Sequence, residues 1–342
     1  MKPTLFTILM VLPFLCFSQY TYKNLQVNFL ESGNDLKNYS FQNLRLYPIY
    51  ARQSFKSQFK NVGNYMPLQE AVQKKKIKIT EKTNGGSVNN LTIENISSDT
   101  IIIICGDVIK GGQQDRIVQK DFLLKPKSGK KNLEVFCVES GRWHAQEPPP
   151  PPAPTRQPTS RVSRNFTNNV KEVEEAKFED HHNKGSMSLR KVVEKEKDQS
   201  KVWSKVEEIN MKNKTTTATK TYTAVSSSTD FSKKLNSYLQ FFKNKFVADS
   251  NVIGVIVVTG NKVLGCDMFA APTLFKSQYQ SLLHSYATEA IISGQAITIK
   301  PEVVKAYMDK LLANETIQQT TLKQKGNSFV EKGTKLRVSS FD

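Results

Sequence analysis

Residues 101–107 read Ile-Ile-Ile-Ile-Cys-Gly-Asp, an unbroken apolar run that stops at a glycine. A strand with one face in water alternates apolar and polar side chains, whereas a strand covered on both faces is apolar throughout. The run therefore predicts a fully buried strand from Thr100 to Cys105. We expect the fold to be built around this strand.

Strands with an alternating pattern lie on both sides of this run. Ile77 and Ile79 alternate with lysine and threonine, and the alternation resumes between Val88 and Ile96. Short apolar segments, separated by turn residues, then continue to Val138. Short strands spaced in this way are typical of a sandwich or of a folded-over antiparallel sheet.

The C-terminal part of the chain adds helices. Thr229-Asp230 can cap one helix, Pro272 can stand in the first turn of another, and a third follows Pro301. Residues 252–269 have the pattern of a hairpin that turns at Gly260-Asn261. The sequence thus predicts an α+β fold in which C-terminal helices pack on an antiparallel β-rich core. We also expect alternating, strand-like segments at 318–323, 328–331 and 335–341.

A proline-rich insert interrupts this pattern. Five consecutive prolines occupy residues 148–152, within a stretch of polar residues. Proline lacks the backbone N–H that sheets and helices use, and such runs form extended spacers. We therefore expect residues 146–186 to be a long insert, disordered or helical. A helical period then runs from Met187 to Met211, and residues 221–223 are a candidate edge strand.

The first 18 residues have the pattern of a secretory signal peptide. A basic residue precedes an apolar run, 5–17, that is shorter than the ~20 residues of a membrane helix. Cys16 follows a bulky leucine, which favours cleavage near Ser18 over lipid attachment. We therefore expect a chain exported to the periplasm or secreted, with a segment 19–40 that leads into one domain, 41–342.

The chain is strongly basic, with a formal net charge of +18. Such an excess favours anionic partners. The lysines occur in short clusters such as 74–76 and 130–131, without the interleaved aromatic residues of a nucleic-acid platform. We therefore expect an anionic small molecule or an envelope polymer as the partner, or simply a solvated basic surface, and no specific nucleic acid.

Three cysteines follow the signal segment. Cys105 and Cys137 both stand at the ends of expected strands, so they are the candidate disulfide pair in an oxidising compartment. Alternatively, both of them and Cys266 are small buried apolar residues. No spacing of cysteine and histidine matches a zinc site, so the sequence predicts neither a metal nor a cofactor.

The hexad Gly111-Gly112-Gln113-Gln114-Asp115-Arg116 is the most unusual local motif. Paired glycines let a backbone approach a ligand closely, and Arg116 offers a planar fork for a carboxylate or phosphate that Asp115 could orient. The motif lacks the Lys-Ser/Thr of a nucleotide-binding loop. It is either an anion-binding loop or a tight turn whose charges hold loops together.

A second polar cluster, Glu139-Ser140-Gly141-Arg142-Trp143, follows the last strand of this region. Arginine beside tryptophan can present a flat surface to a base or a sugar ring. The alternative is that Trp143 packs under a loop while Arg142 pairs with Glu139 or Asp115. In either case we expect the two motifs to meet in space.

Support for catalysis is weaker. Asp115, Glu139 and Asp267 are the candidate acid–base carboxylates, but their spacing is not diagnostic. Cys137 and His144 could form a nucleophile–base pair only in a geometry that sequence does not show. His284 lies among the apolar positions of a helix, where a packed imidazole is the usual outcome.

These motifs resemble one family. GDVIKGGQQDR at 106–116, followed by CVESGRW at 137–143, is similar to the ARPP-1 family, the ARG and rhodanese-phosphatase-superfamily-associated protein domain. VLGCDMF at 263–269 and LLHSYA at 282–287 resemble its C-terminal half, so the similarity covers residues 41–342. The family often carries Gly-Gly-Lys-Gln where this chain has Gln113, which removes a cation from the loop.

The resemblance implies a domain without an established activity. The family name refers to an association with ADP-ribosylglycohydrolases, which implies ADP-ribose or NAD-related ligands. Our first hypothesis is an exported binding module that recognises an anionic or sugar-like ligand through the two motifs. The alternatives are a hydrolase of phosphorylated or glycosidic bonds and a structural protein of the cell envelope. The candidate ligand-binding residues are Gly111, Gly112, Gln113, Asp115, Arg116, Glu139, Arg142 and Trp143.

Overall fold

The computed structural model describes residues 19–29, 33–82, 87–142, 178–179 and 184–342. Residues 1–18, where we expect a signal peptide, and most of the proline-rich insert, with Trp143, lie outside the described residues. Within them the strands form three sheets, of seven, three and five strands. The class is α+β, as the sequence predicts.

The largest sheet has the order β1-β3-β12-β13-β15-β14, with β2 paired to β3, and all its pairs are antiparallel. Its central hairpin turns at Gly260, where the sequence predicts it. Its strands are β1 Leu25–Val27, β2 Ser40–Phe41, β3 Leu44–Ala51, β12 Val252–Thr259, β13 Lys262–Phe269, β14 Gly326–Glu331 and β15 Thr334–Phe341.

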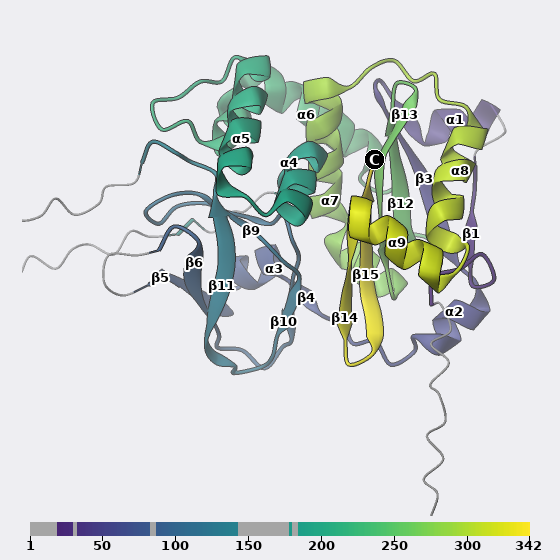
Figure 1. Cartoon of the computed structure of the whole chain (residues 1–342), viewed down its shortest axis with the longest axis horizontal. Helices are drawn as coiled ribbons and strands as arrows, with labels where there is room; N and C mark the ends of the chain where they lie inside the picture. The colour runs from purple at the N-terminus through teal and green to yellow at the C-terminus, as the bar shows by residue number, and fades with distance from the viewer. Residues whose placement is uncertain (1–18, 30–32, 83–86, 143–177, 180–183) are drawn as a thin grey trace, which may run out of the picture.

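Helices cover both faces of this sheet (Figure 1). Val255 and Val257 of β12 contribute to one core, whereas Ile256 and Val258 contribute to another, because successive strand residues point to opposite faces. The first core is covered by α4 Met187–Lys191, π-helix η1 Val192–Glu196, α5 Gln199–Asn213, 3-10 helix η2 Tyr222–Ser227, α6 Thr229–Phe242 and α7 Pro272–Ser293. On the second lie α1 Gly33–Asn38, α2 Gln53–Gln58, α8 Pro301–Leu312 and α9 Glu315–Lys325.

The two smaller sheets surround the apolar run of residues 101–104. All four isoleucines are fully buried: Ile101 and Ile103 contribute to a third core, Ile102 and Ile104 to the first. The predicted two-sided burial is therefore confirmed. The three-stranded sheet is β10 Phe122–Leu124, β7 Ile101–Ile103 and β4 Met66–Pro67, with helix α3 Leu68–Gln73 following β4. The five-stranded sheet is β5 Ile77–Glu81, β6 Asn90–Asn95, β11 Gly129–Cys137, β9 Arg116–Val118 and β8 Val108–Ile109.

Two local predictions are wrong. Residues 318–323 belong to helix α9, whose first turn is capped by the side chain of Asn314. Residues 222–227 form a 3-10 helix, and of the expected edge strand only Thr221 makes a bridge, to Glu139. The helical prediction for 187–211 is confirmed by α4, η1 and α5, with one break at Lys197, which adopts a left-handed conformation. No helix of the described residues is long and apolar enough to cross a membrane.

Candidate functional site

The two polar motifs meet around the carboxylate of Asp115, which lies in the turn between β8 and β9. It accepts hydrogen bonds from the Gly111 backbone N–H (2.9 Å), the Thr221 hydroxyl (2.6 Å) and the Thr223 hydroxyl (2.8 Å). The Arg142 guanidinium donates a fourth, of 3.1 Å. Asp115 is 2% exposed, so its bonds are shielded from water.

Arg142 joins the second motif to the first. Its Nε donates to Glu139 (2.8 Å), and another nitrogen donates to the Gly112 carbonyl (3.1 Å). Glu139 also accepts from the Asp115 N–H at 2.9 Å. Burial opposes the charge of Arg142, but the hydrogen bond and charge of Glu139 outweigh it, so its pKa is raised. Of the two expected arrangements, Arg142 has the one in which it pairs with Glu139 or Asp115, and it pairs with both.

The paired glycines bring the loop against the chain that returns from the insert. Gly112 has φ +63°, and a Cβ at this position would lie 2.5 Å from the ring of Phe178. Phe178 also forms a β-bridge with Gly111. The Gln113 N–H donates to Glu81 at 2.8 Å. These glycines therefore leave room for a neighbouring aromatic ring. Gln113 is the only residue of the hexad that is half-exposed.

Arg116 does not reach the surface. It is fully buried on β9, opposite Cys137 in the strand register, and burial lowers its pKa. Five of the eight candidate ligand-binding residues are joined by hydrogen bonds: Gly111, Gly112, Asp115, Glu139 and Arg142. Gln113 bonds to Glu81 instead, Arg116 is buried on β9, and Trp143 lies outside the described residues. The mutual bonds of the five joined residues give this cluster a supporting role for the surrounding loops. Direct contact of these residues with a ligand stays a prediction.

The cysteines are free thiols. Cys105, Cys137 and Cys266 are all buried, and no disulfide joins Cys105 to Cys137. Cys105 follows β7 of the three-stranded sheet, whereas Cys137 ends β11 of the five-stranded sheet. The Cys137 sulfur instead donates to the Glu139 carbonyl at 2.9 Å. The structure therefore has the second arrangement, in which they are small buried residues. The described residues contain no group of potential metal ligands.

Asp267 lies in the interior of the protein, where it does not reach a substrate as an acid–base group would. It is fully buried and accepts from Arg190 at 2.7 and 3.1 Å, from Arg337 at 2.8 Å and from the Tyr286 hydroxyl at 2.7 Å. Burial alone would raise the pKa of this carboxyl, but the two guanidinium groups outweigh it and hold the pKa below its usual range.

Arg337 extends this buried network, which the sequence did not reveal. It donates to both oxygens of Asp121 (2.8 Å each) and to Glu194 at 3.3 Å. Glu194, on the π-helix, also accepts from the Ser339 hydroxyl at 2.6 Å. Burial raises the pKa of Glu194. π-helical turns are rare and often carry functional or structural side chains.

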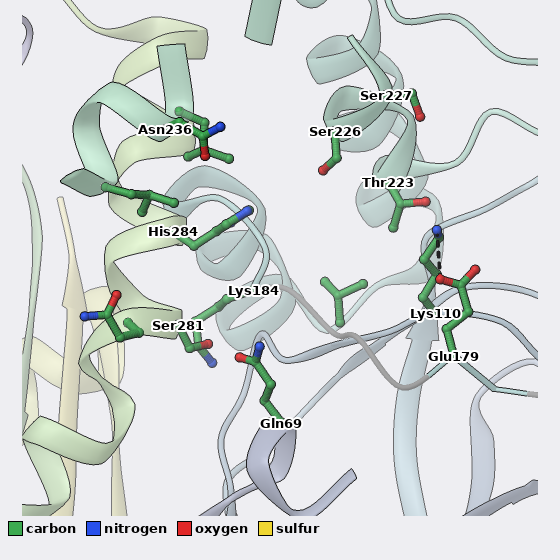
Figure 2. A pocket seen from close by; sticks show the side chains of 14 residues that line it. Gln69, Lys110, Glu179, Lys184, Thr223, Ser226, Ser227, Asn236, Ser281 and His284 are labelled. Atoms are coloured by element: carbon green, nitrogen blue, oxygen red, sulfur yellow. Dashed lines mark ion pairs between the residues drawn. The ribbon is translucent and has the colours of Figure 1, made fainter. Parts of the chain in front are cut away.

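A cleft of about 520 Å³ opens beside the Asp115 cluster, among β8, η2, α6 and α7 (Figure 2). Two lining residues connect it to the motif: Thr223 donates a hydrogen bond to Asp115, and Lys110 directly precedes Gly111 in the chain. Figure 2 shows His284 on one side of the hollow and the Lys110–Glu179 ion pair, of 3.0 Å, on the other. His284 is half-exposed here, whereas we expected a packed imidazole.

Lys184 is the most deeply held cation of the cleft. Its side chain is fully buried, and its Nζ lies 2.5 Å from Asp107. Burial lowers the pKa of Lys184, while Asp107 acts to raise it. Asp107 in turn accepts from the Ile104 N–H at 3.1 Å. The end of the buried apolar run thus fixes a cation at the wall of the cleft.

Most of the other lining residues are neutral and polar, with hydroxyl or amide side chains. Val108 of β8 and Leu235 and Leu239 of α6 add a substantial apolar surface. Such a surface offers donors and acceptors to a polyhydroxylated ligand, and the lysines offer charge to an anionic group. The sequence did not single out these residues, which are Gln69, Thr223, Ser226, Ser227, Asn236, Gln280 and Ser281.

Comparison with known families supports the resemblance seen in the motifs. The model of ARPP-1, described as the ARG and Rhodanese-Phosphatase-superfamily-associated Protein domain, matches residues 36–341. The match spans both polar motifs, the buried network and the cleft. No curated protein and no solved structure matches the chain.

Proposed function

Since the chain belongs to the ARPP-1 family, whose name states no reaction for it, we propose a function from the site itself. The protein is a binding module that takes a small sugar-like ligand with an anionic group into the cleft between Lys110 and His284. The cleft wall combines two lysines, Lys110 and Lys184, with hydroxyl and amide groups.

The cleft carries this proposal because its size and lining suit one small polar molecule. Ligand sites generally measure about 300–1,000 Å³ and contain a few convergent polar groups. Lys110 and Lys184 line this cleft against one carboxylate, Glu179. Lys110 is half-exposed and already pairs with Glu179, so a ligand's anionic group would share or replace that partner. Lys184 is fully buried against Asp107 and would act only through its positive charge behind the wall. The neutral groups would bind its hydroxyls.

The Gly-Gly-Gln-Gln-Asp-Arg loop and the Glu-Ser-Gly-Arg-Trp segment support this cleft from behind. Asp115 binds Thr223 in the cleft wall, and Arg142 holds Asp115 and Glu139 together. In this proposal the two motifs contribute to recognition indirectly, because they hold the wall of the cleft in position.

The hydrolase alternative finds no comparable support. Asp115 and Glu139 are 2% and 3% exposed, and Asp267 is fully buried. Each carboxylate is bound by an arginine. A general acid or base needs access to the substrate and an exchangeable proton, so we make no proposal of catalysis.

Export remains part of the proposal. Its support is the basic start and the apolar run of residues 5–17. The N-terminal sequence of the protein recovered from a periplasmic fraction tests it. Recovery with Met1 still present, in the cytoplasmic fraction, would contradict export.

Ligand binding can be tested by calorimetry with glucuronate, glucose 6-phosphate and ADP-ribose, each of which combines hydroxyls with an anionic group. We expect at least one of them to bind. The Asn236→Trp variant should abolish that binding because the indole fills the cleft, which Asn236 lines from α6. The matched variant Lys234→Trp adds the same ring to an exposed position of α6 that does not line the cleft, and should bind as the wild type does.

Two outcomes would overturn the proposal. One is that none of the three probes binds the wild-type protein. The other is that Asn236→Trp binds as tightly as Lys234→Trp, which would place the ligand elsewhere.

A further inference from the structure

A second hollow, of about 580 Å³, lies between β10 and the first half of β11. The two strands follow one another in the chain and are joined by the turn at 125–128, as Figure 1 shows. Consecutive strands with a short connection normally pair with each other. Here β10 pairs with β7, and β11 pairs with β6 and β9. The strands therefore diverge into two sheets and leave a groove between them.

Both walls of the groove are strand edges without a neighbour among the described residues. β10 is the last strand of its sheet. Gly129–Glu134 of β11 pairs with β6 on one side only, because β9 begins its pairing at Val135. An open edge presents backbone N–H and C=O groups to which another chain can add.

The backbone hydrogen bonds of β11 show which of its N–H and C=O groups face the open edge. The Val135 N–H donates to the Asn89 carbonyl at 3.0 Å, toward β6. The Glu134 carbonyl accepts from the Gln119 N–H at 3.1 Å, on the opposite side. Backbone groups alternate along an antiparallel strand. The N–H and C=O groups of Lys130 and Asn132 therefore point away from β6.

Side chains around the groove combine apolar and basic character. Phe122 and Leu123 of β10 line it and are half-exposed. Lys125 and Lys131 line it and are exposed, while Lys120 pairs with Glu134 at 2.5 Å. Lys127 and Lys130 are exposed nearby. The groove thus has an excess of positive charge above an apolar surface.

We propose that this groove binds an extended acidic peptide segment of a partner protein, which adds as a strand to the open edge at residues 129–133. Backbone hydrogen bonds would supply affinity, apolar side chains would contact Phe122 and Leu123, and carboxylates would meet Lys125 and Lys131. A peptide fits better than a polyanionic polymer because only a peptide matches the backbone groups of both open edges. The site is separate from the cleft beside Asp115.

The probe is a fluorescent heptapeptide of alternating glutamate and valine, measured by fluorescence anisotropy with the full mature chain. We expect it to bind, and the matched lysine–valine peptide not to. N-methylation of alternate residues removes backbone donors without changing charge, and should weaken binding by roughly tenfold or more. Lys125→Glu with Lys131→Glu should cause a similar loss, whereas Lys60→Glu with Lys262→Glu, at exposed lysines outside the groove lining, should not.

A backbone variant tests the edge itself. Asn132→Pro removes an N–H that the ladder with β6 does not use, so the fold is expected to tolerate it. Asn132→Ala removes only the side chain, which donates to Asn90 at 2.8 Å. We expect a roughly tenfold weaker affinity for the proline variant alone. If the proline variant unfolds, binding of the N-methylated peptide to the wild-type protein still tests whether backbone hydrogen bonds hold the peptide.

Strand addition would be overturned if the N-methylated peptide bound as tightly as the parent. It would also be overturned if a sulfated oligosaccharide displaced the peptide and bound more tightly, since that result would identify a surface for polyanions. Equal binding by both lysine double variants would place the peptide outside the groove.

Discussion

Arg190 and Asp267 face each other through two hydrogen bonds, of 2.7 and 3.1 Å, and neither side chain is exposed. Arg190 belongs to α4 and Asp267 to β13, so the pair fastens a helix of the first core to the largest sheet. Arg337 of β15 binds the same carboxylate. A buried ion pair costs desolvation when it forms, and it costs more when one partner is removed.

Asp267→Asn should therefore destabilise the protein strongly. The substitution leaves Arg190 and Arg337 short of one buried negative charge, and we expect a loss of about 3–5 kcal/mol in the free energy of unfolding in urea. The exposed pair of Asp309 with Lys305 provides the control: Asp309→Asn should cost less than about 1 kcal/mol. Similar losses in the two variants would contradict the burial argument.

Glu194→Gln should change how the stability of the protein depends on pH. Two arginines, Arg190 and Arg337, here face three carboxylates, those of Asp267, Asp121 and Glu194. The pKa of Glu194 is raised by burial, so the folded chain holds its proton more tightly than the unfolded chain does. Its contribution is then greatest at low pH and is lost as the pH rises through the folded-state pKa.

The measurement is urea unfolding of wild type and Glu194→Gln at several pH values. The glutamine variant lacks this titration, so its stability relative to wild type should increase as the pH is raised from 4.5, the ordinary carboxyl value, to about 7. A relative stability that falls over this interval would show that Glu194 is held ionised in the folded protein.

Gly112→Ala should cost more than a change of backbone preference alone. Gly112 has φ +63°, and its added Cβ would lie 2.5 Å from the Phe178 ring. Gly129 has nearly the same φ, +62°, with no atom within 4 Å of an added Cβ. Gly129→Ala should therefore lower the free energy of unfolding by only about 1 kcal/mol, the cost of the left-handed backbone. Gly112→Ala should lower it by about 1–3 kcal/mol more, because of the clash with Phe178.

Thermal and urea unfolding of these two alanine variants compare the two terms directly. The double variant Gly112→Ala with Phe178→Ala should remove the clash with the ring and regain part of the stability that Gly112→Ala loses. If the two single variants lose equal stability, Phe178 does not press on the loop.

The three thiols should react only after unfolding. Burial raises the pKa of Cys105, Cys137 and Cys266, so little of the reactive thiolate is present at neutral pH. Titration with a disulfide reagent should be slow for the native chain and should modify all three positions in denaturant without reductant. Failure of Cys105 and Cys137 to react there would indicate the disulfide that the structure does not contain.

The sequence could predict elements whose signal is local. The run at 101–104 predicts burial on both faces because no polar residue interrupts it, and Pro272 marks the start of α7. Pairing of Arg142 with Glu139, three residues away, is likewise one of the two expected arrangements. These are the parts in which neighbours in sequence determine the outcome. Asp115 joins this pair only because the hexad leads into β9, which pairs with β11.

Arg337 shows why the buried network was missed. In β15, Lys335, Arg337 and Ser339 alternate with Leu336 and Val338, which normally indicates a polar face in water. Alternation identifies residues that share a face, but it does not show what covers that face. Here α4 and η1 bring Arg190 and Glu194 to it, and these contacts join positions more than 140 residues apart.

The cleft escaped prediction for the same reason. Thr223, Asn236 and His284 lie on three separate helical segments and have no common motif. Only the packing of η2, α6 and α7 brings them together. The hexad was conspicuous in the sequence, yet its glycines make room for Phe178, which lies within the insert expected at 146–186.

The insert leaves and rejoins the domain at one place. Arg142, its last described neighbour, donates to the Gly112 carbonyl, and Phe178 packs against the same glycine. A loop whose ends are pinned together pays little extra entropy for added length, because the closure cost grows only with the logarithm of that length. The proline-rich segment is therefore free to lengthen, shorten or change in composition over evolution while the cleft keeps its shape.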